Sequence, residues 1–170
     1  MTSRITLALA LAGSIIPATA PAQQCAFDKI RPTTPTEQFD VEKGTALDTK
    51  TGLMWKLCVE GRSGADCMTG SEQYLAWDEA LRQATDSTHA GYKDWRIPNV
   101  KELKSLVEVA CIGPAINEKV FPNTPGDWTW SSSRTVSNTG GAWFVSFYYG
   151  RSERSGNIAR LAVRLVRGGQ

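Results

Sequence analysis

The chain has 170 residues, with 19 basic and 17 acidic side chains and a formal net charge of +2. This length suits one domain with a real hydrophobic core after removal of a leader. The nearly balanced charge argues against nucleic acid as a general partner.

Residues 1–22 have the features of a secretory signal. A single basic residue, Arg4, precedes the apolar run 5–16, which is too short to span a bilayer. Small residues follow, and we expect cleavage after Ala22 and export to the periplasm or the extracellular space. A lipid anchor on Cys25 is the disfavoured alternative, because two glutamines precede it. No later segment is long and apolar enough to predict a membrane span.

Four cysteines in an exported chain predict two disulfides, for which three pairings are possible. Cys58 and Cys67 flank a polar insert that contains glycine, which favours a disulfide-closed loop and leaves Cys25 to pair with Cys111. Metal binding by the thiols is the rival interpretation. It is disfavoured because the chain has one histidine and an oxidising destination. We expect no cofactor and no metal.

The first half of the mature chain predicts an extended lead-in and then strands. Residues 23–38 are rich in proline and threonine and read as an extended N-terminal segment, so the domain is expected to cover 39–170. Alternating apolar residues predict a short strand pair from Phe39 with a kink at Gly44, and a hairpin over 45–57.

Two helices are expected. The first lies at about 74–84, where Trp77, Ala80, Leu81 and Ala84 form one apolar stripe. The second begins after Pro98, which keeps the preceding residue extended. Asn99 can cap this helix and Glu102 can complete a capping box. Apolar residues continue at helical spacing to Ala110, so Cys111 is expected at the end of this helix.

The remaining segments predict strands joined by loops. Residues 112–127 are irregular, and strands are expected at 128–133, 143–148 and 161–165, with a turn at 137–141 and a polar loop at 150–157. Short antiparallel strands, two helices and long loops describe an α+β domain.

Five pieces of the sequence together resemble a bacterial envelope domain family, DUF1566, also called the Lcl C-terminal domain after the Legionella collagen-like protein. They are residues 51–55 (Thr-Gly-Leu-Met-Trp), 77–81 (Trp-Asp-Glu-Ala-Leu), 94–98 with 101–103 (Asp-Trp-Arg-Ile-Pro and Lys-Glu-Leu), 130–133 with 142–145 (Trp-Ser-Ser-Ser and Ala-Trp-Phe-Val) and 163–169 (Val-Arg-Leu-Val-Arg-Gly-Gly). The resemblance runs from about Gly44 to the C-terminus. It implies a C-type-lectin-like fold and, by analogy with the collagen-like protein, adhesion, binding of sulfated glycans and trimer formation.

Several departures narrow what the resemblance implies. The chain has no collagen-like repeat to force a trimer, and it lacks the Glu-Pro-Asn, Gln-Pro-Asp and Trp-Asn-Asp triplets of calcium-dependent sugar sites. The pattern also resembles, more distantly, formylglycine-generating enzymes, whose reactive cysteines lie near the C-terminal end of the domain. This chain has no cysteine after Cys111. Its only histidine, His89, lies in a polar loop with no Gly-x-Ser-x-Gly elbow in the chain, so we expect no catalytic residues.

The late loops are the predicted ligand-binding surface, because loops carry binding more often than framework does and Arg with Tyr is common at recognition sites. The candidate residues are Trp128, Ser132, Tyr148, Tyr149, Arg151, Arg154 and Asn157. The structural alternatives are a solvated hairpin tip and a polar strand edge at 131–133. Trp55, Trp77 and Trp143 are expected in the core, and Arg164 and Arg167 in structural ion pairs.

Three hypotheses of function remain. The first is an exported, non-catalytic recognition or adhesion domain that binds a glycan, possibly anionic, or a cell-surface or envelope protein. The second is an enzyme of the formylglycine-generating type, or a remnant of one, which would need a free thiol. The third is a structural or assembly subunit of the envelope without a small ligand.

Overall fold

The computed structural model describes residues 22–136, 141–156 and 159–168. It is a mixed α+β domain with two small α-helices, short antiparallel strands and two disulfides, as expected. The leader expected at 1–22 lies outside the described residues except for Ala22. None of the helices in the described part of the chain has the length and apolar content needed to cross a bilayer.

A four-stranded antiparallel sheet contains the predicted hairpin. Its order is β11 (Val166–Arg167), β4 (Leu53–Lys56), β3 (Thr45–Asp48) and β2 (Phe39–Glu42). The expected kink at Gly44 is a tight turn, because Lys43 and Gly44 both have positive φ, at 49° and 76°. Two positive φ angles in a two-residue turn suit the twist of a hairpin.

A three-stranded antiparallel sheet of order β10-β9-β8 forms the other half of the domain. Its strands are β8 (Trp128–Arg134), β9 (Gly141–Ser146) and β10 (Arg151–Gly156). The prediction of a polar loop at 150–157 is therefore wrong for most of its length. β10 pairs with β9 from Arg151 to Gly156, and its polar side chains suit a strand at the edge of a sheet.

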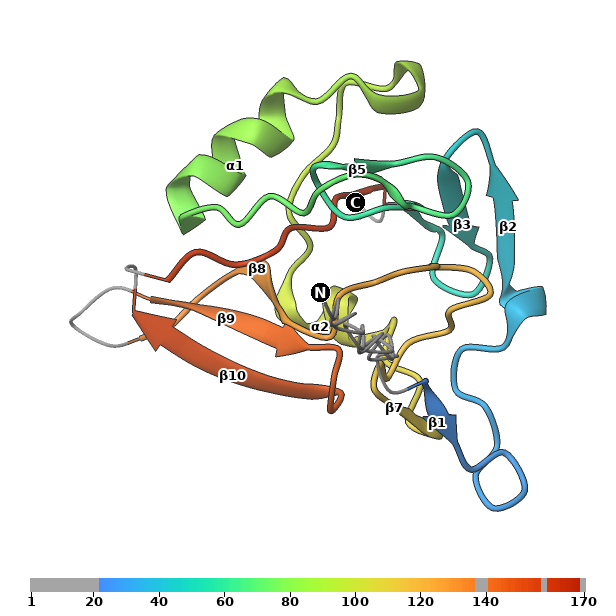
Figure 1. Ribbon diagram of the computed structural model, residues 1–170. Coiled ribbons are helices and arrows are strands. Elements are labelled where there is room, and N and C mark those ends of the chain that lie inside the picture. The colour runs from blue at the N-terminus through green and yellow to red at the C-terminus, as the bar shows by residue number, and fades with distance from the viewer. Residues whose placement is uncertain (1–21, 137–140, 157–158, 169–170) are drawn as a thin grey trace, which may run out of the picture.

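The C-terminal segment joins the two sheets instead of forming the predicted strand at 161–165. It bridges Leu161 to Leu75, just before α1, and Ala162 to Thr129 on β8, and the Leu165 carbonyl accepts from the N–H of Lys56 on β4 before β11 begins at Val166. Residues 162–166 are completely buried. In Figure 1 this red segment runs between the orange three-stranded sheet and helix α1.

Both helices occur, but their bounds differ from expectation. α1 (Trp77–Asp86) begins three residues after the expected start, and Leu75 pairs with Leu161 instead. α2 (Val100–Lys104) has the predicted capping box: Asn99 Oδ1 accepts from the Glu102 N–H at 2.9 Å, and Glu102 Oε2 accepts from the Asn99 N–H at 2.7 Å.

The prediction that α2 continues to Ala110 is wrong. The Ser105 hydroxyl donates to the carbonyl of Glu102 at 2.7 Å, and the chain then leaves the helix through tight turns. A side-chain hydroxyl that takes a helix carbonyl competes with helix continuation. The apolar residues Leu106, Val107 and Ala110 are still buried, so their spacing reports burial and not helix.

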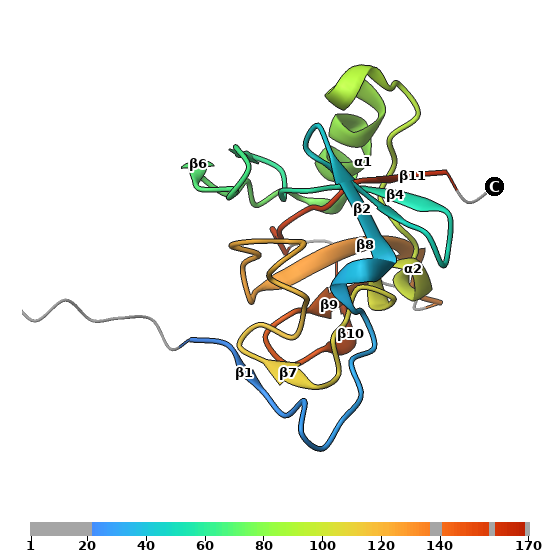
Figure 2. The same cartoon turned by 90° about the vertical axis from the view of Figure 1, so that its right-hand side faces the viewer.

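Both predicted disulfides are present, Cys25–Cys111 and Cys58–Cys67. The first fastens an N-terminal strap, which we define as residues 22–38, to the chain after α2 through β1 (Gln24–Cys25) and β7 (Cys111–Ile112). The second closes a loop that carries β5 (Arg62–Ser63), which pairs with β6 (Thr69–Gly70) just beyond Cys67. Short 3-10 helices occupy Thr36–Gln38 and His89–Gly91. Figures 1 and 2 place β1 and β7 at the opposite end of the domain from α1.

The core consists of two clusters of buried side chains. One lies around Trp55 and Phe121, and the other lies around Trp130 and Ile97 with α1 packed against it. Trp55 is a core residue as predicted, and Trp77 packs against the second cluster. Trp143 is only half-buried and belongs to neither cluster.

The two C-terminal arginines differ. Arg167 forms the expected ion pair, with Asp94 at 2.8 Å. Arg164 forms no ion pair within the described residues: it is completely buried and donates to main-chain carbonyls and to Thr124 Oγ1 at 2.7 Å.

Candidate functional site

One row of side chains crosses the three-stranded sheet at its end nearest the β9–β10 turn. Trp128 on β8 and Arg151 on β10 are both directly opposite Ser146 on β9. Residues directly opposite in an antiparallel pair project from the same face. The sheet therefore brings two of the predicted site residues, Trp128 and Arg151, to one face.

Trp128 lies in the strand predicted at 128–133 and is not fully exposed. It is the first residue of β8, is half-buried, and contacts Phe144 edge-to-face with 4.7 Å between ring centroids. This packing fixes the orientation of the indole, because edge-to-face contacts stabilise one relative position of two rings. Part of the Trp128 ring is therefore occupied by packing against Phe144.

Two exposed tyrosines lie beside Trp128, in the turn between β9 and β10. Tyr148 is 42% exposed and Tyr149 is 57% exposed, and their ring centroids are 4.6 Å apart. The Tyr148 N–H donates to the carbonyl of Gly126 at 2.7 Å, which joins the β9–β10 turn to the start of β8. A Cβ at Gly126 would lie 3.0 Å from the Tyr148 ring, so glycine permits this close approach.

These residues line a shallow hollow of about 360 Å³. Its walls are Gly126, Asp127, Trp128, Ser146, Tyr148 and Tyr149. Arg151 is not a lining residue, but its guanidinium lies over the ring of the lining residue Tyr149, at 5.3 Å from the centroid. The hollow therefore combines aromatic rings with one carboxylate, and a cation lies next to one of its walls.

The carboxylate of Asp127 is held by Tyr74, whose hydroxyl donates to Asp127 Oδ2 at 2.7 Å. This hydrogen bond raises the pKa of Tyr74 to about 12, so the tyrosine stays a donor at neutral pH. The second oxygen of Asp127 has no hydrogen-bond donor among the described residues and can accept a hydrogen bond from a ligand. Asp127 is thus an acceptor held in place at the wall of the hollow.

Two other predicted site residues, Arg154 and Ser132, do not line this hollow. Arg154 lies opposite Trp143, and strand alternation puts it on the other face of β10 from Arg151. Ser132 does not line the hollow; its N–H donates to the Pro98 carbonyl at 2.8 Å. Asn157 lies outside the described residues.

The serines beside Ser132 are structural. The Ser131 hydroxyl donates to the Trp143 carbonyl at 2.7 Å, and the Ser133 hydroxyl accepts from the Val100 N–H at 3.0 Å. These contacts tie β8 to β9 and to the start of α2. They support the structural alternative for residues 131–133.

The contacts of His89 give this residue a structural role. Its Nε2 lies 2.9 Å from the carbonyl of Gly44, and its ring contacts Trp95 edge-to-face at 5.7 Å. The carbonyl of His89 accepts from the Trp95 indole N–H at 3.0 Å. The loop 86–93 is thereby docked onto the hairpin turn.

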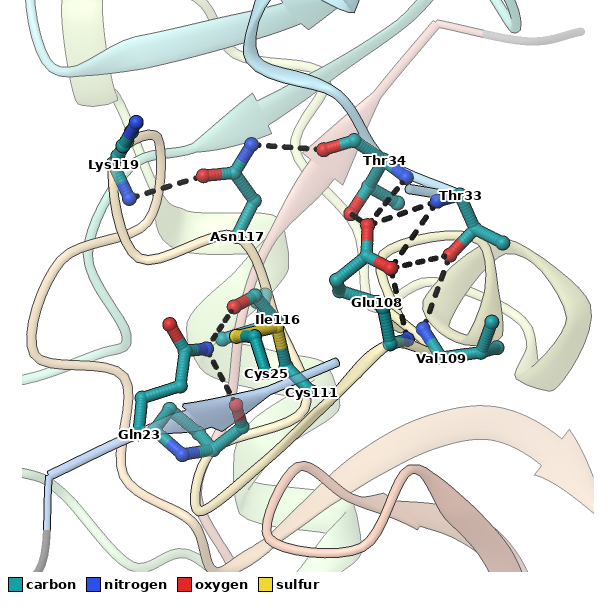
Figure 3. Close-up of a disulfide and its surroundings, with 12 residues drawn as sticks. Gln23, Cys25, Thr33, Thr34, Glu108, Val109, Cys111, Ile116, Asn117 and Lys119 are labelled. Carbon is teal, nitrogen blue, oxygen red and sulfur yellow. Dashed lines mark hydrogen bonds between the residues drawn. A yellow bond between two sulfur atoms is a disulfide. The ribbon is translucent and has the colours of Figure 1, made fainter. Parts of the chain in front are cut away.

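The strap covers a second feature, which the sequence did not predict. Glu108 is 2% exposed, and its carboxylate accepts from the N–H groups of Thr33 and Thr34 at 2.9 Å and of Ala110 at 3.0 Å. The Thr34 hydroxyl donates to it at 3.0 Å. Figure 3 shows this arrangement, which we call the Glu108 clamp, beside the Cys25–Cys111 disulfide.

The Glu108 clamp predicts acid sensitivity. Burial raises the pKa of Glu108, but the backbone donors outweigh it and the net pKa lies below the ordinary value. A folded pKa below the unfolded one stabilises the protein above the unfolded pKa, and this stabilisation disappears as the pH falls through the folded pKa. We expect Glu108→Gln to lower the free energy of unfolding by about 2–3 kcal/mol at pH 7.

Urea unfolding of wild type and variant at pH 7, 5 and 3 measures this effect. The difference between the two proteins should shrink as the pH falls through the lowered folded pKa of Glu108, because protonation removes the charge that the backbone donors stabilise. A variant that is as stable as wild type at pH 7 would mean that the charge of Glu108 contributes nothing.

Within the described ranges, no group of three or more His, Cys, Asp or Glu side chains is placed to hold a metal ion. A family model described as the Lcl C-terminal domain matches residues 44–167. The match includes the three-stranded sheet and, except for β2, the four-stranded sheet. It also includes the hollow lined by Trp128, Tyr148 and Tyr149, which we call the aromatic hollow, and it leaves out the strap. No curated protein matches the chain.

Proposed function

The chain belongs to the Lcl C-terminal domain family, and we propose that it is an exported, non-catalytic recognition domain that binds a glycan through the aromatic hollow. The observation that carries this proposal is the grouping of Trp128, Tyr148 and Tyr149 around one hollow, with Asp127 and Arg151 beside them. The three residues come from two chain segments that the sheet brings together.

The chemistry of the hollow suits a sugar. Exposed aromatic rings offer flat apolar surface for the C–H faces of a pyranose, and Tyr and Trp bring this area with a polar group at the edge. Asp127 can accept from sugar hydroxyls. Arg151 can donate a planar pair of N–H groups to a sulfate or carboxylate. An anionic substituent is therefore expected on the Arg151 side of the ligand.

The sulfur chemistry supports a non-catalytic role. All four cysteines of the chain are paired in the two disulfides. An enzyme of the formylglycine-generating type would need a free thiol, so this alternative lacks its reactive group. Two disulfides also suit the oxidising compartment that the signal at residues 1–22 predicts.

Substitution of the two arginines on β10 tests the proposal. We expect Arg151→Ala to weaken binding of a sulfated oligosaccharide by about 5- to 30-fold, corresponding to about 1–2 kcal/mol. Arg154→Ala is the matched control, since it removes the same side chain from the opposite face of the same strand. Isothermal titration at 50 and 300 mM NaCl measures both variants, and the effect of Arg151 should fall with salt.

Tyr149→Ala should weaken binding of a neutral oligosaccharide as well as of a sulfated one, because packing of a sugar against the ring does not depend on the charge of the sugar. Equal losses for Arg151→Ala and Arg154→Ala would place the site elsewhere. A folded protein that binds no member of a broad glycan array would instead favour an envelope-assembly role.

A further inference from the structure

A second hollow, of about 330 Å³, lies between the strap and residues 108–119. It shares no lining residue with the aromatic hollow, and its strap side lies outside the matched family domain. Phe27, Pro32, Pro35 and Ile116 supply its apolar surface. We call it the strap hollow.

The strap hollow is a fixed feature, because several bonds hold its two walls together. The Gln23 amide donates to the carbonyls of Pro114 and Ile116 at 2.6 and 2.7 Å. The Asn117 amide donates to the Thr34 carbonyl at 2.8 Å. Together with the Cys25–Cys111 disulfide and the Glu108 clamp, these bonds fix the width of the hollow (Figure 3).

The charge of the lining is negative. Glu37, Glu108 and Glu118 line the hollow against a single cation, Lys119. The Glu108 carboxylate is stabilised by neutral N–H and O–H donors, so its charge is not cancelled by a cation. Glu118 forms no ion pair or hydrogen bond with any described residue. Burial raises the pKa of Glu118, which marks its carboxylate as partly desolvated and uncompensated.

A metal ion does not fit these observations, because the acids are not grouped as a coordination shell in the described part of the chain. An organic cation fits better. The apolar walls can take a hydrocarbon stem, and the exposed ring of Phe27, at 55%, can contact a cation with its face. A desolvated carboxylate near a cation recovers the interaction that it lost with water.

We propose that the strap hollow binds an organic cation, an ammonium or guanidinium group on an apolar stem, with Glu118 as its counter-charge. Two sources carry this chemistry, a free alkylamine and a lysine or arginine side chain of another protein. The site is independent of the aromatic hollow and of the proposed glycan binding.

The test uses three probes on the purified protein with both disulfides intact, at pH 7 and low salt. They are hexylamine, hexanoate with a stem of similar length and opposite charge, and a capped Ala-Lys-Ala peptide. Two-dimensional NMR should show hexylamine shifting the side-chain amides of Gln23 and Asn117, with a Kd on the order of 1 mM. Hexanoate should not shift them.

Glu118→Gln should weaken hexylamine about fivefold with little change in thermal unfolding, since glutamine keeps the shape and removes the charge. Glu153→Gln, which neutralises an exposed carboxylate on β10, is the matched control and should bind as wild type does. Tighter binding of the peptide than of hexylamine would point to a protein side chain, and the reverse order to a free amine.

Three results would overturn the proposal. They are equal shifts from hexylamine and hexanoate, unchanged affinity of Glu118→Gln for hexylamine, and equal losses in Glu118→Gln and Glu153→Gln. The first would mean that the hollow recognises only the hydrocarbon stem. The second would mean that Glu118 is not the counter-charge, and the third that the attraction comes from the net charge of the molecule.

Discussion

Replacing Cys25 with serine and Cys111 with alanine is expected to lower the free energy of unfolding by about 4–5 kcal/mol. The disulfide joins residues 86 positions apart, so its loss frees a long loop in the unfolded chain. On the chain-entropy model, the stabilisation grows with the logarithm of that loop length. Since small domains are stable by only about 5–15 kcal/mol, the variant should be close to unfolding at 37 °C.

The matched comparison is a variant in which Cys58 and Cys67 are both alanine. This pair is separated by only 9 positions, so the same model gives a loss of about 2.5–3 kcal/mol. Urea unfolding followed by tryptophan fluorescence measures both variants against wild type, with equal m-values as the check for two-state unfolding.

A smaller loss for the Cys25–Cys111 pair than for the Cys58–Cys67 pair would contradict the prediction. It would mean that the strap detaches locally while the rest of the domain stays folded. The Glu108 clamp resists such local opening, because it also holds the strap. Combining the disulfide variant with Glu108→Gln should therefore detach the strap while the rest of the domain stays folded.

Apart from the Cys25–Cys111 disulfide, which remained once Cys58 was paired with Cys67, the features that the sequence predicted correctly are local ones. The capping box at Asn99 and Glu102 depends on residues three positions apart, and the hairpin at 45–56 depends on one turn. The sequence analysis placed the end of α2 too late, because this end depends on Ser105 and on contacts with a later segment of the chain. Val107 bridges Ile116, and the Glu108 N–H donates to the Ala115 carbonyl at 3.1 Å.

The long-range contacts other than the Cys25–Cys111 disulfide left no pattern in the sequence. Thr33 and Thr34 bind a carboxylate 74–75 residues away, and a threonine pair in a proline-rich segment reads equally well as solvated coil. The segment 161–165 was apolar enough for a strand, but its backbone partners belong to both sheets. Because this segment is buried on all sides, it has the apolar composition of a central strand, although it does not pair continuously with one neighbouring strand.

The sequence did not predict how the candidate residues are grouped in space, because this depends on strand pairing. Interpreting 150–157 as a loop removed the alternation that separates Arg151 from Arg154. Once β10 is known to pair with β9, the register puts Arg151 with Trp128 and puts Arg154 opposite Trp143. Ser132 lies away from the hollow, in a part of β8 where an irregularity between Trp130 and Arg134 breaks the strand alternation.

Arg164 carries the second large expected effect. Its side chain is completely buried, and its guanidinium donates to the carbonyls of Lys56 and Leu57 and to Thr124 Oγ1. It also lies over the ring of Phe121, at 4.9 Å from the centroid. Burial lowers the pKa of Arg164 to about 9, so the group stays charged at neutral pH.

We expect Arg164→Ala to lower the free energy of unfolding by about 3–5 kcal/mol, because it opens a cavity and leaves buried acceptors without their donor. In a domain of this size, such a loss corresponds to a melting temperature roughly 10 °C lower. Arg164→Lys should recover only part of it, since an ammonium group cannot reproduce the planar fork.

Arg167→Ala is the matched control, three residues away on the same segment. Arg167 is partly exposed and pairs with the exposed Asp94, so its loss should cost about 1 kcal/mol or less. Thermal and urea unfolding of the three variants decide between the two roles. If Arg164→Ala and Arg167→Ala unfold alike, the carbonyls of Lys56 and Leu57 must find other donors, and the buried guanidinium does not hold the C-terminal segment against β4.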